Sequence, residues 1–469
     1  MSKIGALGGY HLLYPNLPSC GRAAARIHWS MPTSEKSAAA AEQSRKFGFE
    51  TRMLHAGHIP DAAVGARAVP IYQTTSFVFD DTEMAAQLFE LRQYGNIYTR
   101  IGNPTTAVFE ERIASLEGAT GAVATSSGMA AQLVALMTLL SPGDEIVSSS
   151  HLYGGTVTQF THTFKKLSIK VRFVDPTRLD NWEQAITPKT RVLYGETIGN
   201  PRGSILDLAP LAQLAESKGV PLMVDNTFAT PYLCRPIEHG ATIVIHSATK
   251  FIGGHGNSIG GVLAESGTFD YSGYPTIAGP SPSYHGLRFY ETFGHYGYLM
   301  KARAETVRDT GACLSPTNAF LLLQGLETLS MRMDRHTANA RAVAEFLRGH
   351  RAVEWVSYAG LPDHPDYALA QKYLGGRPGA VFSFGLKASG GDAREAGRRF
   401  IESLQLFSHL ANVGDARSLV IHPGSTTHQQ LSDDELAAAG VGPELVRLSI
   451  GLETVDDLLW DLDQALSAR

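Results

Sequence analysis

The chain has 469 residues, of which 43% are hydrophobic and 18% are charged, and its formal net charge is -5 at pH 7. This is the composition of a soluble globular protein that is long enough for two or three domains. Because the sequence contains no basic domain and no run of lysine or arginine, it lacks an electrostatic site for nucleic acid or for an anionic membrane. The longest apolar run, 130–140, is too short to span a membrane. We therefore expect a small-molecule substrate.

The three cysteines, Cys20, Cys234 and Cys313, are too few and too scattered for a disulfide framework or a tetrahedral zinc site. We expect no metal centre and a reducing, cytoplasmic location. Residues 1–46 read as a disordered extension, since they show no helical or strand periodicity and include the low-complexity stretch 38–41. A transit peptide, or a later start at Met31, remains open for this segment.

The segment 47–105 predicts short strand-like pieces within 69–79, a helix over 82–91 and a loop that contains Tyr98 and Arg100. In an extended chain, side chains two residues apart point the same way, so this phenol and this guanidinium could meet one anionic ligand. A surface ion pair is the alternative reading.

A helix over 105–116 is followed by a short strand, the turn 125–128 and a long apolar helix. The turn brings Ser127, Gly128 and Met129 to a helix N-terminus, where free backbone N–H groups attract phosphate. Alternatively, Ser127 is an ordinary N-cap.

A regular alternation of strands and helices then predicts a mainly parallel sheet. The expected strands are 145–149, 170–174, 191–196, 221–224 and 242–246. Ligands of such sheets bind at the carboxyl ends of the strands. Polar residues follow these ends, namely Tyr153, Glu196 to Asn200, Asp225, Thr227, Ser247, Thr249 and Lys250.

Asp225 ends a strand that should be buried, where an unpaired carboxylate costs several kcal/mol. A protonated pyridine nitrogen would supply its cation, although Asp225 could instead cap the next turn. Tyr153 could stack on a flat heterocycle or be a half-buried aromatic. Lys250 stands between two hydroxyl-bearing residues and a glycine-rich loop, which suits a Schiff-base nucleophile, although a solvated loop lysine fits the same local pattern.

In combination, these residues resemble the pyridoxal-phosphate (PLP) enzymes of cysteine and methionine metabolism, which include the trans-sulfuration enzymes, from about Phe47 to the C-terminus. The resemblance implies an α/β fold of the aspartate-aminotransferase type (PLP fold type I), with a mainly parallel, seven-stranded type of sheet in a PLP-binding domain (106–305). A smaller α+β domain (306–469) would follow.

The resemblance also implies roles for the site residues. Lys250 would carry the cofactor, Asp225 would face the pyridine nitrogen, Asn200 would donate to the ring hydroxyl, and Tyr153 would stack on the ring. Tyr98 and Arg100 would reach the phosphate of a neighbouring subunit, which makes 47–105 an intersubunit arm in a dimer within a tetramer. The implied cofactor-binding set is Tyr98, Arg100, Ser127, Gly128, Met129, Tyr153, Asn200, Asp225, Thr227, Ser247, Thr249 and Lys250.

The last third predicts a long helical region, 311–349, followed by strands at 353–358, 380–386 and 445–450 alternating with helices. Arg447 would point away from the apolar face of its strand, and it reads either as a carboxylate clamp or as a surface arginine. The resemblance favours the clamp and implies a substrate site made of Tyr98, Asn412 and Arg447.

Three stretches, 196–201, 282–286 and 411–423, resemble the O-acetylhomoserine sulfhydrylases of this family. Gly155 replaces a cysteine that is usual in methionine γ-lyases, and Asn412 begins a stretch that differs from the Ser-Leu-Gly turn of cystathionine enzymes. The expected reaction converts O-acetyl-L-homoserine and sulfide, or methanethiol, to homocysteine, or methionine, and acetate. Its catalytic residues would be Lys250, Tyr153 and Asp225. A γ-lyase, a cystathionine γ-synthase and a catalytically silent PLP-binding protein remain alternatives.

Overall fold

The computed structural model describes residues 47–61, 64–201, 203–387, 392–423, 426 and 442–467. Residues 47–59 and the chain from 68 onward belong to one compact unit. The extension 1–46, for which we predict disorder, lies outside the described residues. No helix among those that are described is long and apolar enough to cross a membrane.

The larger sheet has the strand order β1-β7-β6-β5-β4-β2-β3 in the described chain. Its strands are β1 (Gly121–Thr125), β2 (Glu145–Ser149), β3 (Lys170–Val174), β4 (Thr190–Glu196), β5 (Leu222–Asp225), β6 (Ile243–Ser247) and β7 (Gly261–Glu265). The neighbouring pairs β3–β2, β2–β4, β4–β5 and β5–β6 are parallel, whereas β7 runs antiparallel to both β6 and β1. The mainly parallel sheet is confirmed, but β7 was not predicted, because its first glycine reads as the end of the preceding glycine-rich loop.

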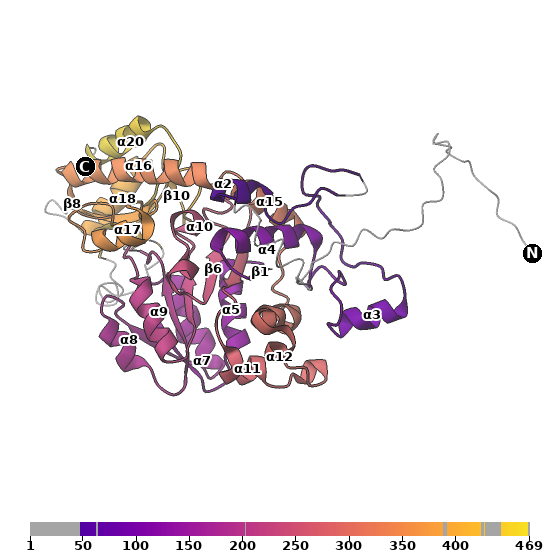
Figure 1. The fold of residues 1–469 in the computed structure, drawn as a ribbon. Coiled ribbons are helices and arrows are strands. Elements are labelled where there is room, and N and C mark those ends of the chain that lie inside the picture. Colours follow the sequence, from indigo (N-terminus) through magenta and orange to yellow (C-terminus); the bar gives the residue numbers. More distant parts are fainter. Residues whose placement is uncertain are drawn as a thin grey trace, which may run out of the picture. The chain divides into compact units, whose positions relative to one another are not determined.

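Apart from the partly exposed edge strand β3, both faces of this sheet are buried, which explains its nearly continuous apolar strands. Val192, Met223 and Ile243 pack into one apolar cluster, and the alternate residues of the same strands, such as Leu193 and Val224, pack into another. The helices of this part surround the sheet in Figure 1. They are α4 (Pro104–Glu117), α5 (Gly128–Leu139), α6 (Gly154–Thr158), α7 (Phe164–Lys166), α8 (Leu179–Ala185), α9 (Leu208–Ser217), α10 (Thr230–Leu233), α11 (Pro275–Ala278), α12 (Phe289–Phe293), α13 (Gly297–Lys301) and α14 (Arg308–Thr310).

Several short turns of helix connect these elements. Two are π-helices, η1 (Gln159–Thr163) and η6 (Ala302–Val307), and the 3-10 turns are η2 (Pro236–His239), η3 (Tyr271–Gly273), η4 (Pro282–Tyr284) and η5 (Gly294–Tyr296).

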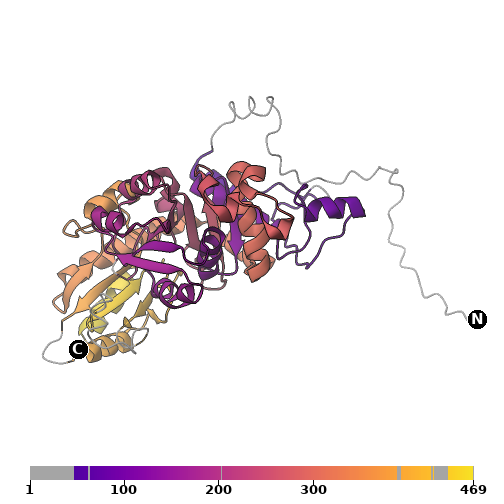
Figure 2. The same ribbon diagram turned by 90° about the horizontal axis from the view of Figure 1, so that it is seen from below.

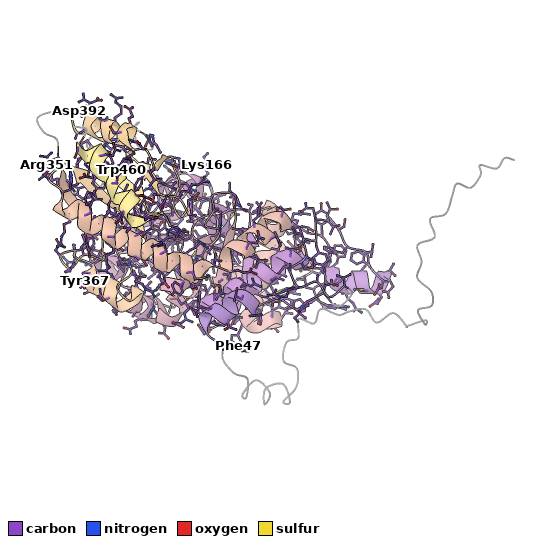
Figure 3. The ribbon with its side chains drawn as sticks, turned by 90° about the horizontal axis from the view of Figure 1, so that it is seen from above. Phe47, Lys166, Arg351, Tyr367, Asp392 and Trp460 are labelled. Carbon is purple, nitrogen blue, oxygen red and sulfur yellow. The ribbon has the colours of Figure 1, made fainter. Side chains whose placement is uncertain are left out.

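The second sheet is smaller, with the order β10-β11-β12-β9-β8. Its strands are β8 (Val353–Ser357), β9 (Val381–Leu386), β10 (Ser408–His409), β11 (Leu419–Ile421) and β12 (Leu445–Ser449), and its helices are α15 (Pro316–Leu326), α16 (Leu329–Gly349), α17 (Tyr367–Leu374), α18 (Ala393–Ser403) and α20 (Val455–Ser467). On α20, Leu458 and Leu462 are buried, whereas Trp460 is 56% exposed on the outer surface (Figure 3). These two sheets confirm the predicted fold class, while the domain limit at 305/306 stays a prediction.

The predicted helical region 311–349 is in fact two helices, α15 and α16. The break is stabilised by Arg332, which donates from Nη2 to the carbonyl oxygen of Gly325 at 2.6 Å. This is a helix-end carbonyl that has no partner within α15. Arg332 therefore supplies a donor at the end of α15, where the N–H and the hydroxyl of Thr328 also reach the Gly325 carbonyl, each at 3.4 Å.

The segment 47–105 contains α2 (Phe49–His55) and α3 (Thr82–Phe89). The strand prediction within 69–79 is wrong, since the described part of this stretch holds only an isolated bridge between Ser76 and Tyr98. α3 ends before Leu91, whose φ of 59° is left-handed. Figures 1 and 2 both show α3 standing apart from the two sheets. Val78, near this helix, is 95% exposed.

Candidate functional site

A cavity of about 260 Å³ lies at the carboxyl ends of β4, β5 and β6, below the segment 411–413 and Arg447 of β12. It gathers the predicted residues Ser127, Gly128, Met129, Tyr153, Asn200, Asp225, Thr227, Ser247, Thr249, Lys250, Asn412 and Arg447. Tyr98 and Arg100 are absent from its walls as described. A larger cavity, of about 790 Å³, includes Leu222 and Thr242 near the amino ends of β5 and β6, and none of the predicted site residues lines it.

The N-terminus of α5 packs directly against the end of β6. A Cβ atom added to Gly128 would lie 2.5 Å from Cβ of Ser247, so only glycine allows this approach. Ser127 caps α5 by accepting a hydrogen bond from the backbone N–H of Ala130 at 3.1 Å. Gly128 and Met129, whose N–H groups have no intrahelical acceptor, line the cavity. This corner suits a phosphate group.

The hydroxyl groups around this corner differ in what they bind. Thr249 exchanges two hydrogen bonds of 3.1 Å between its hydroxyl and the backbone of Gly260, so it also closes the loop after Lys250. Thr227 accepts a hydrogen bond from the N–H of Ser247 at 2.8 Å. These contacts tie the ends of β5 and β6 to each other and to the loop.

Asp225 takes the turn-capping role that its sequence position allows. Its carboxylate caps the following turn by accepting from the N–H of Thr227 at 2.9 Å. Burial raises its pKa, and the hydrogen bonds from Thr227 oppose that rise. No ion pair to Asp225 is present within the described ranges, so a cation placed in the cavity would stabilise its charged form.

Glu196, next to Asp225 in the β4–β5 register, holds the backbone of Tyr153. Its Oε1 atom accepts from the N–H of Tyr153 at 2.6 Å. Burial and the neighbouring Asp225 raise the pKa of Glu196. The Tyr153 side chain is 50% exposed at the cavity.

Lys250 follows β6 directly, and its Nζ donates to the side-chain oxygen of Asn412. Burial, with the positive charge of Arg447, lowers the pKa of Lys250 to about 8. Gly414 has a φ of +75°, and a Cβ there would lie 2.7 Å from the amide nitrogen of Phe251. A glycine is therefore needed for the 412–414 segment to approach the lysine.

Arg447 points into the cavity from β12, on the strand face that the sequence predicts. It donates to Oδ1 of Asn200 at 3.3 Å and to the carbonyl of Asn412 at 3.4 Å. Burial lowers its pKa to about 10, so it stays a cation at neutral pH. Both hydrogen bonds are long, which leaves the guanidinium available to a carboxylate ligand.

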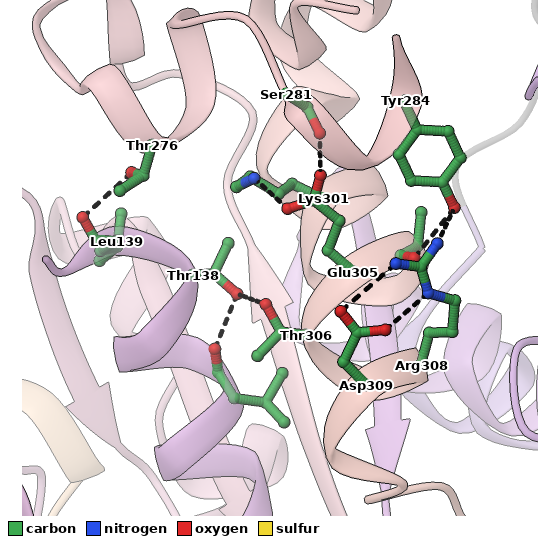
Figure 4. A network of polar contacts seen from close by, with 12 residues as sticks. Thr138, Leu139, Thr276, Ser281, Tyr284, Lys301, Glu305, Thr306, Arg308 and Asp309 are labelled. Carbon is green, nitrogen blue, oxygen red and sulfur yellow. Dashed lines mark hydrogen bonds and ion pairs between the residues drawn. The ribbon is translucent and has the colours of Figure 1, made fainter. Parts of the chain in front are cut away.

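Tyr98 and Arg100 lie away from the cavity of their own chain. Arg100 donates to the carbonyl of Arg308 at 2.7 Å, and its guanidinium lies 5.5 Å from the Tyr98 ring centroid. Arg308 itself binds the hydroxyl of Tyr284 at 3.0 Å and the carboxylate of Asp309 (Figure 4).

The stretch 282–286 lies in this polar network and outside the cavity. Tyr284 donates to the carbonyl of Ala304 at 3.0 Å, and Glu305 joins Ser281 to Lys301 (Figure 4). These contacts hold η6 and α14 in place. The carbonyl of Arg308, in α14, accepts the hydrogen bond from Arg100.

The sequence reasoning missed several cavity residues, namely Gln132, Thr156, Ile198, Phe228, Ile259, Ala411 and Val413. Gln132 accepts from the hydroxyl groups of Tyr194 at 2.8 Å and Thr156 at 3.1 Å. The signal was present, since Gln132 is a polar residue in an apolar helix, one turn after Gly128.

The arrangement fits PLP on physical grounds. A crevice beside a helix N-terminus suits the phosphate, a buried carboxylate that lacks a cation suits the pyridine nitrogen, and a lysine with a lowered pKa suits the aldehyde. Within the described chain, these three features border one cavity. The site is thus that of a PLP-dependent α/β enzyme.

Comparison with known proteins identifies the family. A model of the family "Cys/Met metabolism PLP-dependent enzyme" matches residues 50–467, and the chain belongs to this family. It is 51% identical to the O-acetyl-L-homoserine sulfhydrylase of Leptospira meyeri, over 90% of this chain and 97% of that protein. It is also 51% identical to the homocysteine synthase of Schizosaccharomyces pombe, over 89% and 98% of the two chains.

A solved structure shares the fold. It is a Campylobacter jejuni protein named as an O-acetylhomoserine (thiol)-lyase, which contains N'-pyridoxyl-lysine-5'-monophosphate. The TM-score is 0.86 at 39% identity, and the match covers 90% of this chain and 100% of that one. PLP is accordingly the cofactor of this family member, and its fold is that of PLP fold type I.

Proposed function

We propose that this enzyme transfers the four-carbon chain of O-acetyl-L-homoserine to sulfide, which forms L-homocysteine and releases acetate. Relatives about half identical over nearly the whole chain are named O-acetyl-L-homoserine sulfhydrylase or homocysteine synthase. The observation that carries the proposal is the cavity that holds Lys250, Arg447 and Asn412 together. Methanethiol is a second acceptor to test.

The cofactor would be held by the residues that surround the cavity. The phosphate would lie at Ser127, Gly128, Met129, Ser247 and Thr249, and the ring would lie between Tyr153 and the strand ends, with Asp225, Thr227 and Asn200 at its edge. When bound, PLP supplies an electron sink that makes the substrate protons near the amine acidic.

In the proposed reaction, Lys250 carries the proton. Because its pKa is lowered to about 8, an appreciable fraction of the free amine is neutral near neutral pH and can accept a proton from the substrate Cα. Asn412 holds this amine through its side-chain oxygen. The same lysine can later return the proton.

Arg447 would bind the substrate carboxylate. Its two long hydrogen bonds, to Asn200 and Asn412, can be exchanged for a bidentate contact without leaving a buried charge unpaired. Tyr153 is half-exposed and its backbone N–H is held by Glu196, and we expect it to assist proton transfer where acetate leaves. A substrate fixed by its carboxylate presents its ester to the open side of the cavity.

The assembly belongs to the proposal as well. Tyr98 and Arg100, which lie outside their own cavity, would serve the phosphate and the substrate of a second copy, and 47–105 would be the intersubunit arm. Exposed apolar side chains on this arm, at Ile71, Val78, Phe89 and Tyr94, support burial against another chain. We propose a dimer within a homotetramer that functions in a reducing cytoplasm, with domains at 106–305 and 306–469.

The deciding experiment is a substrate panel with the purified, PLP-loaded protein. O-Acetylhomoserine with sulfide should yield homocysteine and acetate faster than O-succinylhomoserine, O-acetylserine or methionine. Release of ammonia from methionine would instead identify a γ-lyase, and a preference for cysteine as acceptor a cystathionine γ-synthase. Normal cofactor absorbance without turnover would identify a silent PLP-binding protein.

A further inference from the structure

A chain of buried polar side chains lies on the sheet face opposite the cofactor site. On β4, β5 and β6, the cavity residues Glu196, Asp225 and Ser247 are adjacent in sequence to Thr197, Asn226 and His246 respectively. Consecutive side chains of extended segments point to opposite faces. All three of these neighbours are fully buried.

Hydrogen bonds join these residues to one carboxylate. Thr197 donates to Oδ1 of Asn226 at 2.7 Å, and Asn226 donates from Nδ2 to Oε1 of Glu117 at 3.0 Å. Nε2 of His246 lies 2.6 Å from the same oxygen. Glu117 is the last residue of α4 and has an exposed fraction of 0%.

Backbone hydrogen bonds join the same three strand ends. The N–H of Thr197 donates to the carbonyl of Asp225 at 3.0 Å, and the N–H of Asn226 donates to the carbonyl of Ile245 at 2.9 Å. The three strand ends that present the cofactor residues are therefore bound to each other and to the end of α4.

His246 is the ring partner of the buried Glu117 carboxylate. A fully buried carboxylate is stable only if it is paired and hydrogen-bonded, and His246 makes the ion-pair contact with Glu117. His246 is adjacent in sequence to Ile245, which is paired with Asp225 in the β5–β6 register. Burial and the hydrogen bonds from Thr227 set most of the Asp225 pKa, and the His246 charge lowers it further.

We propose that Glu117 and His246 are positioning residues for the reaction: the pair fixes the carboxyl ends of β4, β5 and β6 and thereby holds Asp225 toward the ring nitrogen of PLP. This inference rests on the proposed function only through the role of Asp225. Other titratable groups border the pair or the cavity and are left unchanged in the variants below; they are Tyr194, Glu196, Cys234, Lys250 and Arg447.

The test compares His246→Gln and Glu117→Gln with the wild-type protein, all loaded with PLP. Glutamine at 246 can still donate to Glu117 but carries no charge. In Glu117→Gln, a neutral amide replaces the carboxylate that His246 contacts. In both variants, the low-pH midpoint at which the visible absorbance of the cofactor is lost should rise by about half to one pH unit. We expect kcat to fall about tenfold with KM within about twofold.

Glu145→Gln is the matched control. Glu145 is a buried carboxylate at the amino end of β2, paired with Arg172 at 2.8 Å and remote from the cavity lining. Its replacement should lower Tm and leave the absorbance midpoint unchanged. Thr197→Val removes only the hydrogen bond from Thr197 to Asn226, so it should shift the absorbance midpoint in the same direction but by less. If His246→Gln and Glu117→Gln fail to fold, the Thr197→Val result tests the inference.

A fall in Tm with an unchanged midpoint in His246→Gln, Glu117→Gln and Thr197→Val would overturn the inference and leave the pair a purely structural one. The absorbance measurement needs PLP but no turnover. If the midpoint shifts as expected while the wild-type protein fails to convert O-acetylhomoserine, the positioning role stands and the proposed reaction falls.

Discussion

The amine of Lys250 is a base at moderate pH because it is buried beside another cation. An ordinary lysine has a pKa near 10.5, whereas burial and the Arg447 guanidinium lower that of Lys250 to about 8. The partner Asn412 lies 162 residues further along the chain. The reactivity of Lys250 is thus a property of tertiary packing.

Replacing Arg447 by glutamine should raise the pKa of Lys250, since a neighbouring positive charge is removed. In the cofactor-free protein, the modification of Lys250 by an amine-reactive reagent should have its midpoint near pH 8, and in Arg447→Gln the midpoint should move to higher pH. In the loaded enzyme, KM for the amino acid should increase at least about tenfold. Lys250→Ala, which lacks the reactive amine, is the control.

An unchanged midpoint in Arg447→Gln would show that burial alone sets the pKa of Lys250. Lys250→Ala should also lose the visible absorbance of the bound cofactor and the turnover together, as measured by spectroscopy and homocysteine formation. A Lys250→Ala protein that retains full turnover would contradict the proposed mechanism.

Glu265 is a buried carboxyl group on β7 whose pKa burial raises to about 8. Between pH 4.5 and 8, the folded state binds the proton that the unfolded state has released, so stability falls as the pH rises through this window. Glu265→Gln should remove this loss, which amounts to up to about 4 kcal/mol. Thermal melts at pH 5 and pH 8 test this prediction. The Tm of the variant should be higher than that of the wild-type protein at pH 8, and the two Tm values should differ little at pH 5. An equal effect at both values would contradict the assignment.

The sequence predicts the polar groups of the site well, because the carboxyl ends of parallel strands meet at one edge of the sheet. Asp225 and Lys250 follow from that rule. It does not predict the Lys250–Asn412 contact, the shifted pKa values or the buried chain behind Asp225, because these depend on segments that meet only after folding. Nor does it predict that Arg100 contacts the carbonyl of Arg308 rather than the cavity of its own chain.

At the scale of elements, the loop after Lys250 is held by a buried arginine. Arg332, in the first turn of α16, donates to the carbonyls of Phe251 at 2.7 Å and Ile252 at 3.2 Å, in addition to Gly325. A Cβ at Gly254 would lie 2.1 Å from Nη1 of Arg332. The break between α15 and α16, which sequence periodicity did not predict, therefore serves to bring this guanidinium to the lysine loop.

Arg332→Gln should destabilise the protein by about 3 kcal/mol, because it leaves buried carbonyl groups without donors. It should also reduce kcat, since the loop that carries Lys250 loses its support. Thermal melts and steady-state kinetics measure the two effects, and Arg332→Lys should restore part of each. Wild-type kcat in a destabilised Arg332→Gln protein would mean that the loop keeps its shape without this residue.

At the scale of the whole molecule, each chain would carry an incomplete site and the missing part of another. Figures 1 and 2 show α3 apart from both sheets, and Tyr98 is 40% exposed. The irregular conformation of 69–79 fits this interpretation, because a segment that pairs with no strand of its own chain gains little from the β conformation.

Intersubunit complementation tests the shared site. Lys250→Ala and Arg100→Ala chains should each be nearly inactive, because one lacks the base and the other lacks the phosphate ligand. After mixing, dissociation and reassociation, random dimers should regain about a quarter of wild-type activity, since half of them contain one intact site. Mixed dimers that form but show no activity would place Arg100 in the site of its own chain.

The pairing of β1 with the antiparallel strand β7 joins parts of the chain that are far apart in sequence. Gly121 of β1 pairs with Glu265 of β7, 144 residues later, and the corner of Gly128 and Ser247 lies between these two strands in sequence. Contacts of such separation form slowly, because a long loop must be ordered before they contribute. During synthesis on the ribosome, β1 therefore has no strand to pair with until residue 265 has emerged. We expect nascent chains cut short before this point to aggregate and to depend on chaperones.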